Sequence, residues 1–434
     1  MKVLCVHNYY GSAAPSGENV AFDCDVDLLA QHGHEVLRFT THSDELRAKR
    51  VTGRVRGAFT CIWNPAAETR LRALIGRERP DIMHVHNVFP RLSPAILSAA
   101  DCTGTATVLT LHNYRIFCAA GTAMRAGAVC TLCGDQHSVK PALRHRCYRN
   151  SLLATVPIAT SIALHRSLGT LSTFVDAFIA LTQFQRDFFV DRGLLPAERM
   201  HVRANFMPGA PQPMDWRKRE ARVVFVGRLS DDKGVDVALA AWKLWGADAP
   251  ELVVIGDGPR RRVLERMARE QIRRNQIRFL GYRTAADTHA MMRAARLVVV
   301  PSRAFEGFPM VIREAIAFGV PIVASDVGAL ADIVAHSGCG VAFTVGDPVA
   351  LMQVARALWN DPQRMQRIAS NAVEVYGRLY SERAAYDALM QVYAQAQAER
   401  RATGGDPLRR DPASAAAGRR RPGTDDGSGW SDGR

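Results

Sequence analysis

The sequence predicts an α/β protein with two doubly wound domains, each built on a parallel sheet. Its 434 residues are too many for one ordinary core, so two domains of roughly 200 residues each are expected. Short apolar runs of strand length alternate with helical patterns, and a proline-rich stretch, "NFMPGAPQPMDWRKRE", separates them into two series. Continuous apolar strands between helices are typical of parallel sheets that are covered on both faces.

This proline-rich stretch also divides the chain into domains. The expected segments are a first domain over 1–205 with a cysteine-bearing insertion over 118–147, a linker over 206–221, a second domain over 222–380, a helix over 381–398 that packs back on the first domain, and a tail over 399–434. The tail has almost no apolar residues, so it cannot bury enough surface to fold and is expected to be disordered.

Charge and cysteine content indicate which partners and which cellular location to expect. The net charge of +14 suits anionic partners, which include nucleotide phosphates, nucleic acid and anionic membranes, but does not choose among them. The first residues, "MKVLCVHNYYG", have the pattern of a strand rather than of a signal peptide. No apolar run reaches the ~20 residues that span a bilayer. Nine cysteines without a secretory signal favour a cytoplasmic protein, with peripheral association at the inner face of the plasma membrane as an option.

The first series of strands carries histidines at its ends. The expected strands are "KVLCVHN", "HEVLRFT", "DIMHVHN", "ATVLTLHN", "DAFIALT" and "MHVRANF". Ligands of doubly wound sheets bind outside the carboxyl ends of the strands, so the residues there are candidates for a site. His84 and His86 end the third strand, and His112 ends the fourth. A single histidine is more often packed than functional, and this interpretation stays open for His84.

The second series is "RVVFVGR", "ELVVIGD", "IRFLGY", "RLVVVPS", "PIVASD" and "GVAFTV". Its first strand is followed by Arg228 and Lys233, beside two glycines and a helix. A guanidinium, an ammonium and a helix N-terminus together can bind a diphosphate, although two surface cations in a polar loop would look the same.

The next two strands end in glycine-containing turns. Gly256, Asp257 and Gly258 follow the second strand, and Tyr282 follows the third. Glycine allows a backbone to approach a ligand closely, but such turns are common between strands and helices.

The stretch "SRAFEGFPMVIREAIAFG" follows the fourth strand of this series. Glu306 is expected in the loop and Glu314 one to two turns into the helix, so both face the same crevice as Arg228 and Lys233. A carboxylate accepts paired hydrogen bonds from the vicinal hydroxyls of a ribose or hexose. The rest of this helix is apolar, which argues against a solvated surface helix.

These stretches resemble the donor domain of retaining glycosyltransferases of family 4, which have the GT-B fold of two Rossmann-like domains facing a central cleft. The pattern of two glutamates separated by seven residues is the most specific element. The resemblance implies that Arg228 and Lys233 hold the diphosphate of a nucleotide-sugar and that Glu306 contacts the transferred sugar. Glu314 would contact the ribose. The other donor-side residues that it implies are Gly256, Asp257, Gly258, Tyr282, Gly307, Phe308 and Pro309, the last three through their backbone. Asp332 departs from the glutamate that is common at its position.

The first domain resembles the same family less closely. Gly17, in "PSGEN", matches a glycine-rich loop that approaches the donor phosphates and the acceptor. The resemblance places His112 next to the reacting sugar, with His86 as a second candidate. Arg115 is a candidate for binding the acceptor.

Four cysteines gather in the insertion, at Cys118, Cys130, Cys133 and Cys147. Clustered thiols in a cytoplasmic protein indicate structural zinc more often than disulfides, and zinc would stabilise a loop of this length. His137 or His145 would be able to replace one thiol, and four independent thiols are the alternative. The helix that follows the insertion, together with Arg144, Arg146 and Arg149, fits either ordinary packing or a membrane interface.

The sequence therefore predicts a retaining hexosyltransferase that uses a UDP- or GDP-sugar and a glycan or lipid-linked acceptor, in cell-envelope or exopolysaccharide biosynthesis. Its chemistry requires no cofactor, and no specific nucleic acid is expected. The alternatives are a non-catalytic nucleotide- or nucleic-acid-binding protein and another GT-B enzyme, such as a nucleotide-sugar epimerase.

Overall fold

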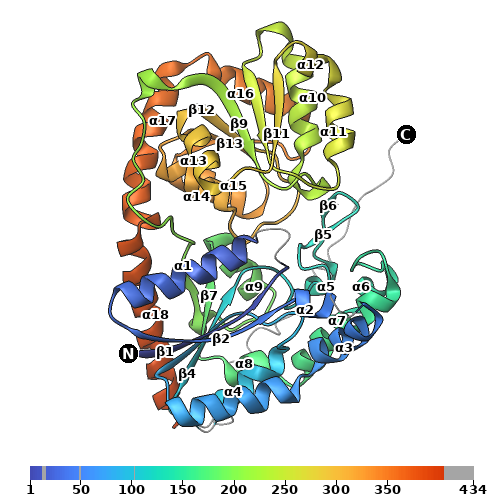
Figure 1. The fold of residues 1–434 in the computed structure, drawn as a ribbon, viewed down its shortest axis with the longest axis vertical. Helices are drawn as coiled ribbons and strands as arrows, with labels where there is room; N and C mark the ends of the chain where they lie inside the picture. Colours follow the sequence, from blue (N-terminus) through green and yellow to red (C-terminus); the bar gives the residue numbers. More distant parts are fainter. Residues whose placement is uncertain (12–15, 48–49, 102, 405–434) are drawn as a thin grey trace, which may run out of the picture.

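Two parallel sheets, one in each half of the chain, organise the molecule (Figure 1). The computed structural model describes residues 1–11, 16–47, 50–101 and 103–404. Both sheets have six strands, all paired in parallel, with helices on both faces. The predicted pair of doubly wound sheets is therefore confirmed.

The N-terminal sheet has the strand order β2-β1-β3-β4-β7-β8. Its strands are β1 (Lys2–Tyr9), β2 (Glu35–His42), β3 (Ile82–Asn87), β4 (Ala106–Leu111), β7 (Ala177–Ala180) and β8 (Met200–Val202). The order reverses between β1 and β3, so the connections after these two strands leave on opposite sides of the sheet and open a crevice at their carboxyl ends.

Alternation along these strands builds two cores. Leu4 and Val6 face a cluster under α4 (Pro65–Glu78) and α9 (Gln183–Asp191), whereas Val3 and Cys5 face α1 (Gly17–Gln31). Side chains on both faces of β1 are fully buried, so its sequence contains one continuous apolar run.

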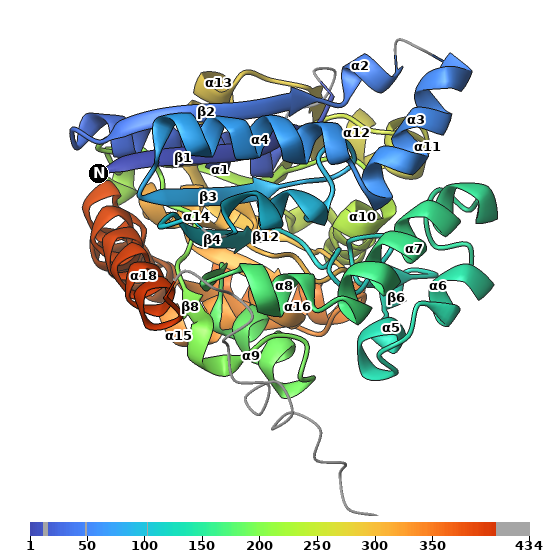
Figure 2. The same ribbon diagram turned by 90° about the horizontal axis from the view of Figure 1, so that it is seen from below.

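The remaining helices of this half surround the sheet (Figure 2). They are α2 (Asp44–Arg47), α3 (Arg50–Ile62), η1 (Pro94–Ala100), α5 (Leu132–Asp135), α6 (Lys140–Arg144), α7 (Leu152–Ser167), α8 (Thr170–Phe174) and η2 (Ala197–Arg199). The insertion contains α5, α6 and the hairpin of β5 (Met124–Arg125) and β6 (Ala128–Val129), and it lies beside α7 at one side of the molecule.

The C-terminal sheet has the order β11-β10-β9-β12-β13-β14, which reverses between β9 and β12. Its strands are β9 (Glu220–Val226), β10 (Glu251–Ile255), β11 (Ile277–Gly281), β12 (Ala295–Val300), β13 (Ile322–Ser325) and β14 (Gly340–Phe343). Its helices are η3 (Trp216–Lys218), η4 (Asp231–Lys233), α10 (Val235–Trp245), η5 (Gly246–Asp248), α11 (Arg261–Met267), α12 (Arg269–Arg273), α13 (Ala285–Ala294), α14 (Met310–Ala317), α15 (Gly328–Ser337), α16 (Pro348–Trp359), α17 (Pro362–Val375) and η6 (Tyr376–Tyr380).

The last helix, α18 (Glu382–Ala402), runs down the left side of Figure 1 onto the N-terminal half. Leu389, Val392 and Tyr393 pack in the same core cluster as β1, β4 and β7.

Two predicted boundaries differ from the structure. The helix continues past 398 to Ala402 because Arg400 is buried, its guanidinium donating to the carbonyl of Ala100. Strand β9 begins at Glu220, inside the stretch predicted as a linker. The predicted disorder of the tail concerns mainly 405–434, which lie outside the described residues.

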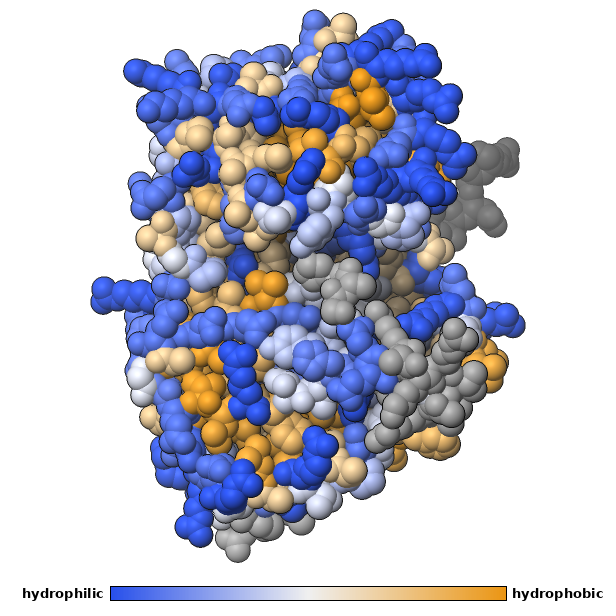
Figure 3. Space-filling view, in the orientation of Figure 1, coloured by the Kyte–Doolittle hydropathy of each residue, from blue (hydrophilic) through white to orange (hydrophobic). Residues whose placement is uncertain are grey.

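The surface is strongly hydrophilic over α11 and α12, at the upper right of Figure 3, where several arginines lie. Across the described ranges, none of the helices combines the length and the apolar content needed to cross a bilayer.

Candidate active site

A lysine–glutamate pair lies at the carboxyl ends of β9 and β12. The Nζ of Lys233 is 2.8 Å from an Oε of Glu306, and Ser302 donates a hydrogen bond to the other carboxylate oxygen. The glutamate side chain is only 15% exposed. Because the sheet order reverses between these two strands, the pair sits in the crevice where doubly wound sheets bind ligands. The structure thus brings together two of the residues predicted to hold a nucleotide-sugar.

Arg228 belongs to the same loop but points into solvent. Its side chain is 62% exposed, with the guanidinium 3.6 Å from Asp232 and within hydrogen-bonding distance of Ser230. Long side chains at the surface reorient at little cost, so Arg228 is able to swing toward an anion beside Lys233.

The glycines after β10 have a packing role. A Cβ atom at Gly256, whose φ is 136°, would overlap the carbonyl of Gly227, and one at Gly258 would overlap the backbone of Leu229. The close approach that these glycines allow is therefore first of all to the neighbouring β9 loop. Asp257 is already engaged, because its carboxylate accepts from the backbone N–H of Gly258 and pairs with Arg261 at 2.9 Å.

Tyr282 lies apart from this centre. It follows β11, the edge strand of the sheet, and its side chain is 63% exposed. A contact with a donor would have to come from a part of the ligand that extends along the sheet edge.

Glu314 lies on α14 and is largely buried. One carboxylate oxygen is 3.7 Å from the Nε2 of His289 and 4.0 Å from the guanidinium of Arg313. Arg313 itself is buried and donates to the carbonyl of Phe206. The carboxylate oxygens of Glu314 are the kind of acceptor that binds the hydroxyls of a ribose.

The loop before α14 meets the N-terminal half directly. A Cβ atom at Gly307 would lie 2.6 Å from the carbonyl oxygen of His112, and one at Gly17 would lie 3.1 Å from the side chain of Met310. The two predicted glycines are therefore places where the halves of the molecule approach each other closely. Phe308 is buried in the core against Tyr380, and Pro309 has no N–H, so of these three residues only Gly307 and Phe308 can donate from the backbone.

Asp332 joins the two halves as well. Its carboxylate accepts a hydrogen bond from the backbone N–H of Phe184 at 3.3 Å and lies 3.0 Å from His336. The aspartate that departs from the family pattern thus bonds a helix of the N-terminal half.

His112 is hydrogen-bonded to His86, with 3.0 Å between the two ring nitrogens. Burial lowers the pKa of His112 to about 3, and neighbouring histidines and Arg203 add to this effect. Burial likewise lowers the pKa of His86 well below its ordinary value. Both rings are neutral at physiological pH, so His112 can position a ligand through hydrogen bonds but does not supply positive charge.

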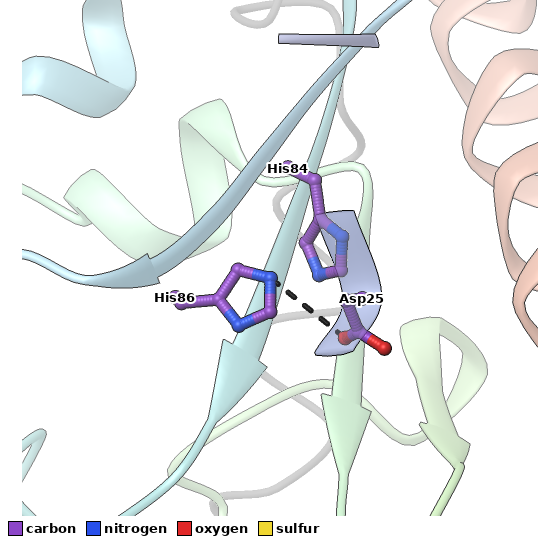
Figure 4. A group of neighbouring side chains, drawn as sticks. All are labelled: Asp25, His84 and His86. Atoms are coloured by element: carbon purple, nitrogen blue, oxygen red, sulfur yellow. Dashed lines mark ion pairs between the residues drawn. The ribbon is translucent and has the colours of Figure 1, made fainter. Parts of the chain in front are cut away.

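Asp25, His84 and His86 form a compact group whose ligand atoms lie within 4.8 Å of one another (Figure 4). Its residues do not suit a metal. Asp25 is paired through both oxygens with the guanidinium of Arg203, at 2.6 and 2.9 Å. Both ring nitrogens of His84 are taken, by Tyr393 and by Thr110. This group is a buried ion pair with packed histidines, and the packed interpretation of His84 holds.

Arg115 is held by its own loop. Its guanidinium lies 4.2 Å from the ring centre of Phe89 and donates to the carbonyl of Ala119. A role in binding an acceptor would require these contacts to break or to be shared.

Two residues that were not predicted from the sequence, Glu18 and Asn113, also lie beside the crevice. Glu18, in the first turn of α1, accepts a hydrogen bond from Asn113 at 2.7 Å, and its second carboxylate oxygen is buried with no hydrogen-bond partner among the described residues. Burial raises the pKa of this carboxyl. Both residues stand next to predicted ones, Gly17 and His112, so extending each strand-end motif by one residue would have found them.

A largely apolar cavity of about 210 Å³ opens beneath α7. His86 and His112 line one end, and Ile158 and Ile162 of α7 line the wall. Arg166 also lines it, and one of its guanidinium nitrogens is buried with no hydrogen-bond partner in the part of the chain that the structure describes.

The four cysteines of the insertion and His145 line a separate, much smaller cavity. His137 lines the large cavity instead, so it is not a substitute for a thiol here.

Comparisons with known proteins show similarity to glycosyltransferases in both halves of the chain. The family model described as glycosyl transferases group 1 matches residues 210–375, and the one described as glycosyltransferase family 4 matches residues 26–207. An α-D-kanosaminyltransferase from Streptomyces kanamyceticus is 29% identical over 234 residues, which cover 50% of this chain and 60% of that protein. The chain thus spans less than two thirds of this curated relative.

Solved structures share the fold over nearly the whole chain. Sucrose-phosphate synthase from Thermosynechococcus elongatus aligns with a TM-score of 0.65 at 17% identity, covering 92% of this chain and 100% of that one. Anabaena Alr3699/HepE, solved in complex with UDP, aligns with a TM-score of 0.60 at 19% identity, covering 91% of this chain and 100% of that one.

Proposed function

Because the chain belongs to the family 4 glycosyltransferases and has the GT-B fold, we propose that it transfers a hexose from a nucleotide diphosphate to an acceptor, with retention at the anomeric carbon. The observation that carries this proposal is the Lys233–Glu306 pair, placed at the point where the strand order of its sheet reverses and one residue away from the Gly307–His112 approach.

Each donor-side group has a chemical task in this proposal. Glycosyl transfer develops negative charge on the departing diphosphate, and Lys233 with a reoriented Arg228 would stabilise that charge by about 3 kcal/mol for a well-aimed donor. Glu306 would accept hydrogen bonds from the transferred sugar, and Glu314 from the ribose. UDP is the first nucleotide to test because a structural neighbour was solved with it.

The neutral His112 would hold the sugar from the opposite side of the cleft. Its hydrogen bond to His86 fixes the ring, and its backbone already touches Gly307. Glu18 is the stronger acceptor-side candidate, because it has a buried carboxylate oxygen that no described residue bonds, whereas Arg115 is engaged.

The cavity beneath α7 favours an acceptor with an apolar part. The two histidines and apolar residues of α7 line it. On the outer surface, exposed apolar side chains gather on α3, just after it, and on α7: Phe59, Trp63, Leu152, Leu153 and Val156. Arg144, Arg146 and Arg149, at the start of this surface, are basic and exposed or half-exposed. Exposed apolar side chains flanked by arginines suit an anionic membrane, so a lipid-linked acceptor of cell-envelope or exopolysaccharide synthesis fits this side.

Donor binding is tested by thermal unfolding of wild type and Glu314→Ala with UDP, GDP, ADP and their sugars. A shift with one nucleotide that disappears in Glu314→Ala is expected, while Glu270→Ala, which changes an exposed glutamate on α12, keeps it. No shift with any nucleotide would contradict the proposal. Release of the nucleoside diphosphate only when an acceptor is present would then separate a transferase from a nucleotide-binding protein.

Membrane binding by the exposed apolar surface of α3 and α7 is tested by flotation with anionic vesicles. Leu153 is 88% exposed on α7, and Leu153→Asp is expected to reduce vesicle binding several-fold. Leu244→Asp changes another exposed leucine, on α10 in the other half of the molecule, and is expected to bind as wild type. Equal binding of both variants would remove the support for a membrane-bound acceptor.

The nucleic-acid alternative has one feature in its favour, the arginines of α11 and α12. Several arginines in or next to these helices already form ion pairs within the protein. Arg261 pairs with Asp257 and Glu265, and Arg274, just after α12, pairs with Glu270. Strong, salt-dependent binding to arbitrary DNA would support this alternative over the transferase.

A further inference from the structure

The cysteines of the insertion come together although they are separated along the chain. Cys118 follows the turn after β4, Cys130 follows the β5–β6 hairpin, Cys133 lies in α5 and Cys147 follows α6. All four, with no disulfide between them, line one cavity of about 10 Å³. This volume is about the space of a single bound atom.

From this convergence we propose that Cys118, Cys130, Cys133 and Cys147 bind one Zn²⁺ as four thiolates. Tetrahedral coordination by four thiolates, with one C-x2-C pair, is a common structural zinc site. The inference does not depend on the proposed function.

The local backbone supplies a frame for such a site. The N–H of Cys130 donates to the carbonyl of Ala123, and the N–H of Cys118 donates to the carbonyl of Tyr114. The N–H of Cys147 donates to the carbonyl of Ala142, and Phe117 packs against Gly134 beside Cys133. Each cysteine is therefore anchored by a backbone bond or by packing at its own position.

The insertion has little regular secondary structure. Its regular structure is a hairpin of two-residue strands and two helices of four and five residues. Within it Ala123, Ala126, His137 and Arg146 have positive φ, which is unfavourable for residues with a Cβ. A metal that joins its two ends would offset these costs.

Metal binding would draw the sulfur atoms inward. Among the described residues, Asp25, His84 and His86 are the group whose possible ligand atoms all lie within 4.8 Å of one another. The sulfur atoms of the cysteines are not that close together. Zn–S bonds of about 2.3 Å require closer sulfurs, which rotation of the thiol side chains can supply. His145 also lines the cavity but is exposed, so it is assigned no ligand role.

The consequence for the molecule lies in the residues before the insertion. Asn113 bonds Glu18, and Arg115 packs on Phe89. Closing the insertion on a metal would hold this end of the loop next to the crevice.

The test is elemental analysis of the full chain, purified under reducing conditions without a metal-affinity tag or chelator. One zinc per chain is expected in wild type, in His145→Ala and in Cys24→Ser, which changes a half-buried cysteine outside the insertion. Cys130→Ser and Cys147→Ser are expected to lose it. Cobalt substituted into wild type should give the absorption of a tetrahedral thiolate complex.

Wild-type protein decides the question even where a cysteine variant fails to fold. Absence of zinc after refolding with zinc and reductant, or a disulfide between any two of the four cysteines in reduced preparations, would overturn the proposal. Loss of zinc in His145→Ala would overturn the assignment of four thiolates.

Discussion

Gly307 and His112 meet where the two halves of the molecule approach each other, and the space between them is smaller than a side chain. The glycine is required there by a backbone neighbour from the other half. A substitution at this position therefore reports on how precisely the halves must fit for transfer.

Gly307→Ala is expected to lower kcat/KM for sugar transfer about 100-fold, because its Cβ would lie 2.6 Å from the carbonyl of His112 and displace the loop that carries Glu306. Gly76→Ala is the matched control, since a Cβ there meets no atom within 4 Å and alanine suits the interior of α4. Steady-state kinetics measure both. Unchanged kinetics in Gly307→Ala would show that the halves do not need this contact.

Glu18→Gln keeps the shape of the side chain and can still accept from Asn113, but it removes the charge. If the unpaired oxygen of Glu18 binds the acceptor, the acceptor KM should rise about tenfold while the donor KM stays constant. An equal change in both constants would indicate a general structural effect instead.

At the scale of elements, α1 is attached to the rest of the N-terminal half through charge as well as apolar packing. The buried pair of Asp25 and Arg203 links this helix to the chain just after β8, and Arg203 also donates to the carbonyl of Ala385 in α18. Strand β8 itself ends at Val202, earlier than the run "MHVRANF" indicated.

Asp25→Asn is expected to destabilise the protein by about 3–5 kcal/mol, because it leaves a buried guanidinium without its counter-charge. Asp27→Asn on the same helix is the control. Its partner Arg38 is 3.6 Å away and both side chains are exposed, so a change of less than about 0.5 kcal/mol is expected. Urea unfolding measures both variants, and similar losses would refute the buried pair as the anchor of α1.

On the scale of the whole molecule, the buried histidines make stability depend on pH. Burial lowers the pKa of His7 and His84 to about 4 and that of His112 to about 3. An unfolded histidine has a pKa near 6.5, so below that pH the unfolded chain binds more protons than the folded one.

The free energy of unfolding should therefore be highest above pH 6.5 and fall as the pH is lowered toward 4. Each group contributes of the order of 3 kcal/mol over the full range, since one pKa unit corresponds to about 1.4 kcal/mol. Chemical denaturation between pH 7.5 and pH 5, where carboxylates contribute little, measures this slope. A stability that stays constant or rises as the pH falls would contradict the neutral, buried state of these rings.

Much of the fold could be predicted from the sequence. Each apolar run predicted as a strand contains one, and a central strand such as β4 is largely apolar because both of its faces are buried. The crevice rule then placed Lys233 and Glu306 at neighbouring strand ends, and the structure joins them. The same rule could not exclude the exposed Tyr282 or the loop-bound Arg115, because a strand end says nothing about which way a side chain turns.

What the sequence by itself determined are local properties: which segments form strands and helices, and which residues follow each strand. Contacts between distant segments were decided only by the tertiary structure. They include the hydrogen bond between His86 and His112, the approach of Gly307 to His112, and the gathering of four cysteines around one cavity. The physical reason is that spacing along the chain sets backbone geometry, whereas burial, pKa and ligand geometry depend on neighbours that only packing supplies.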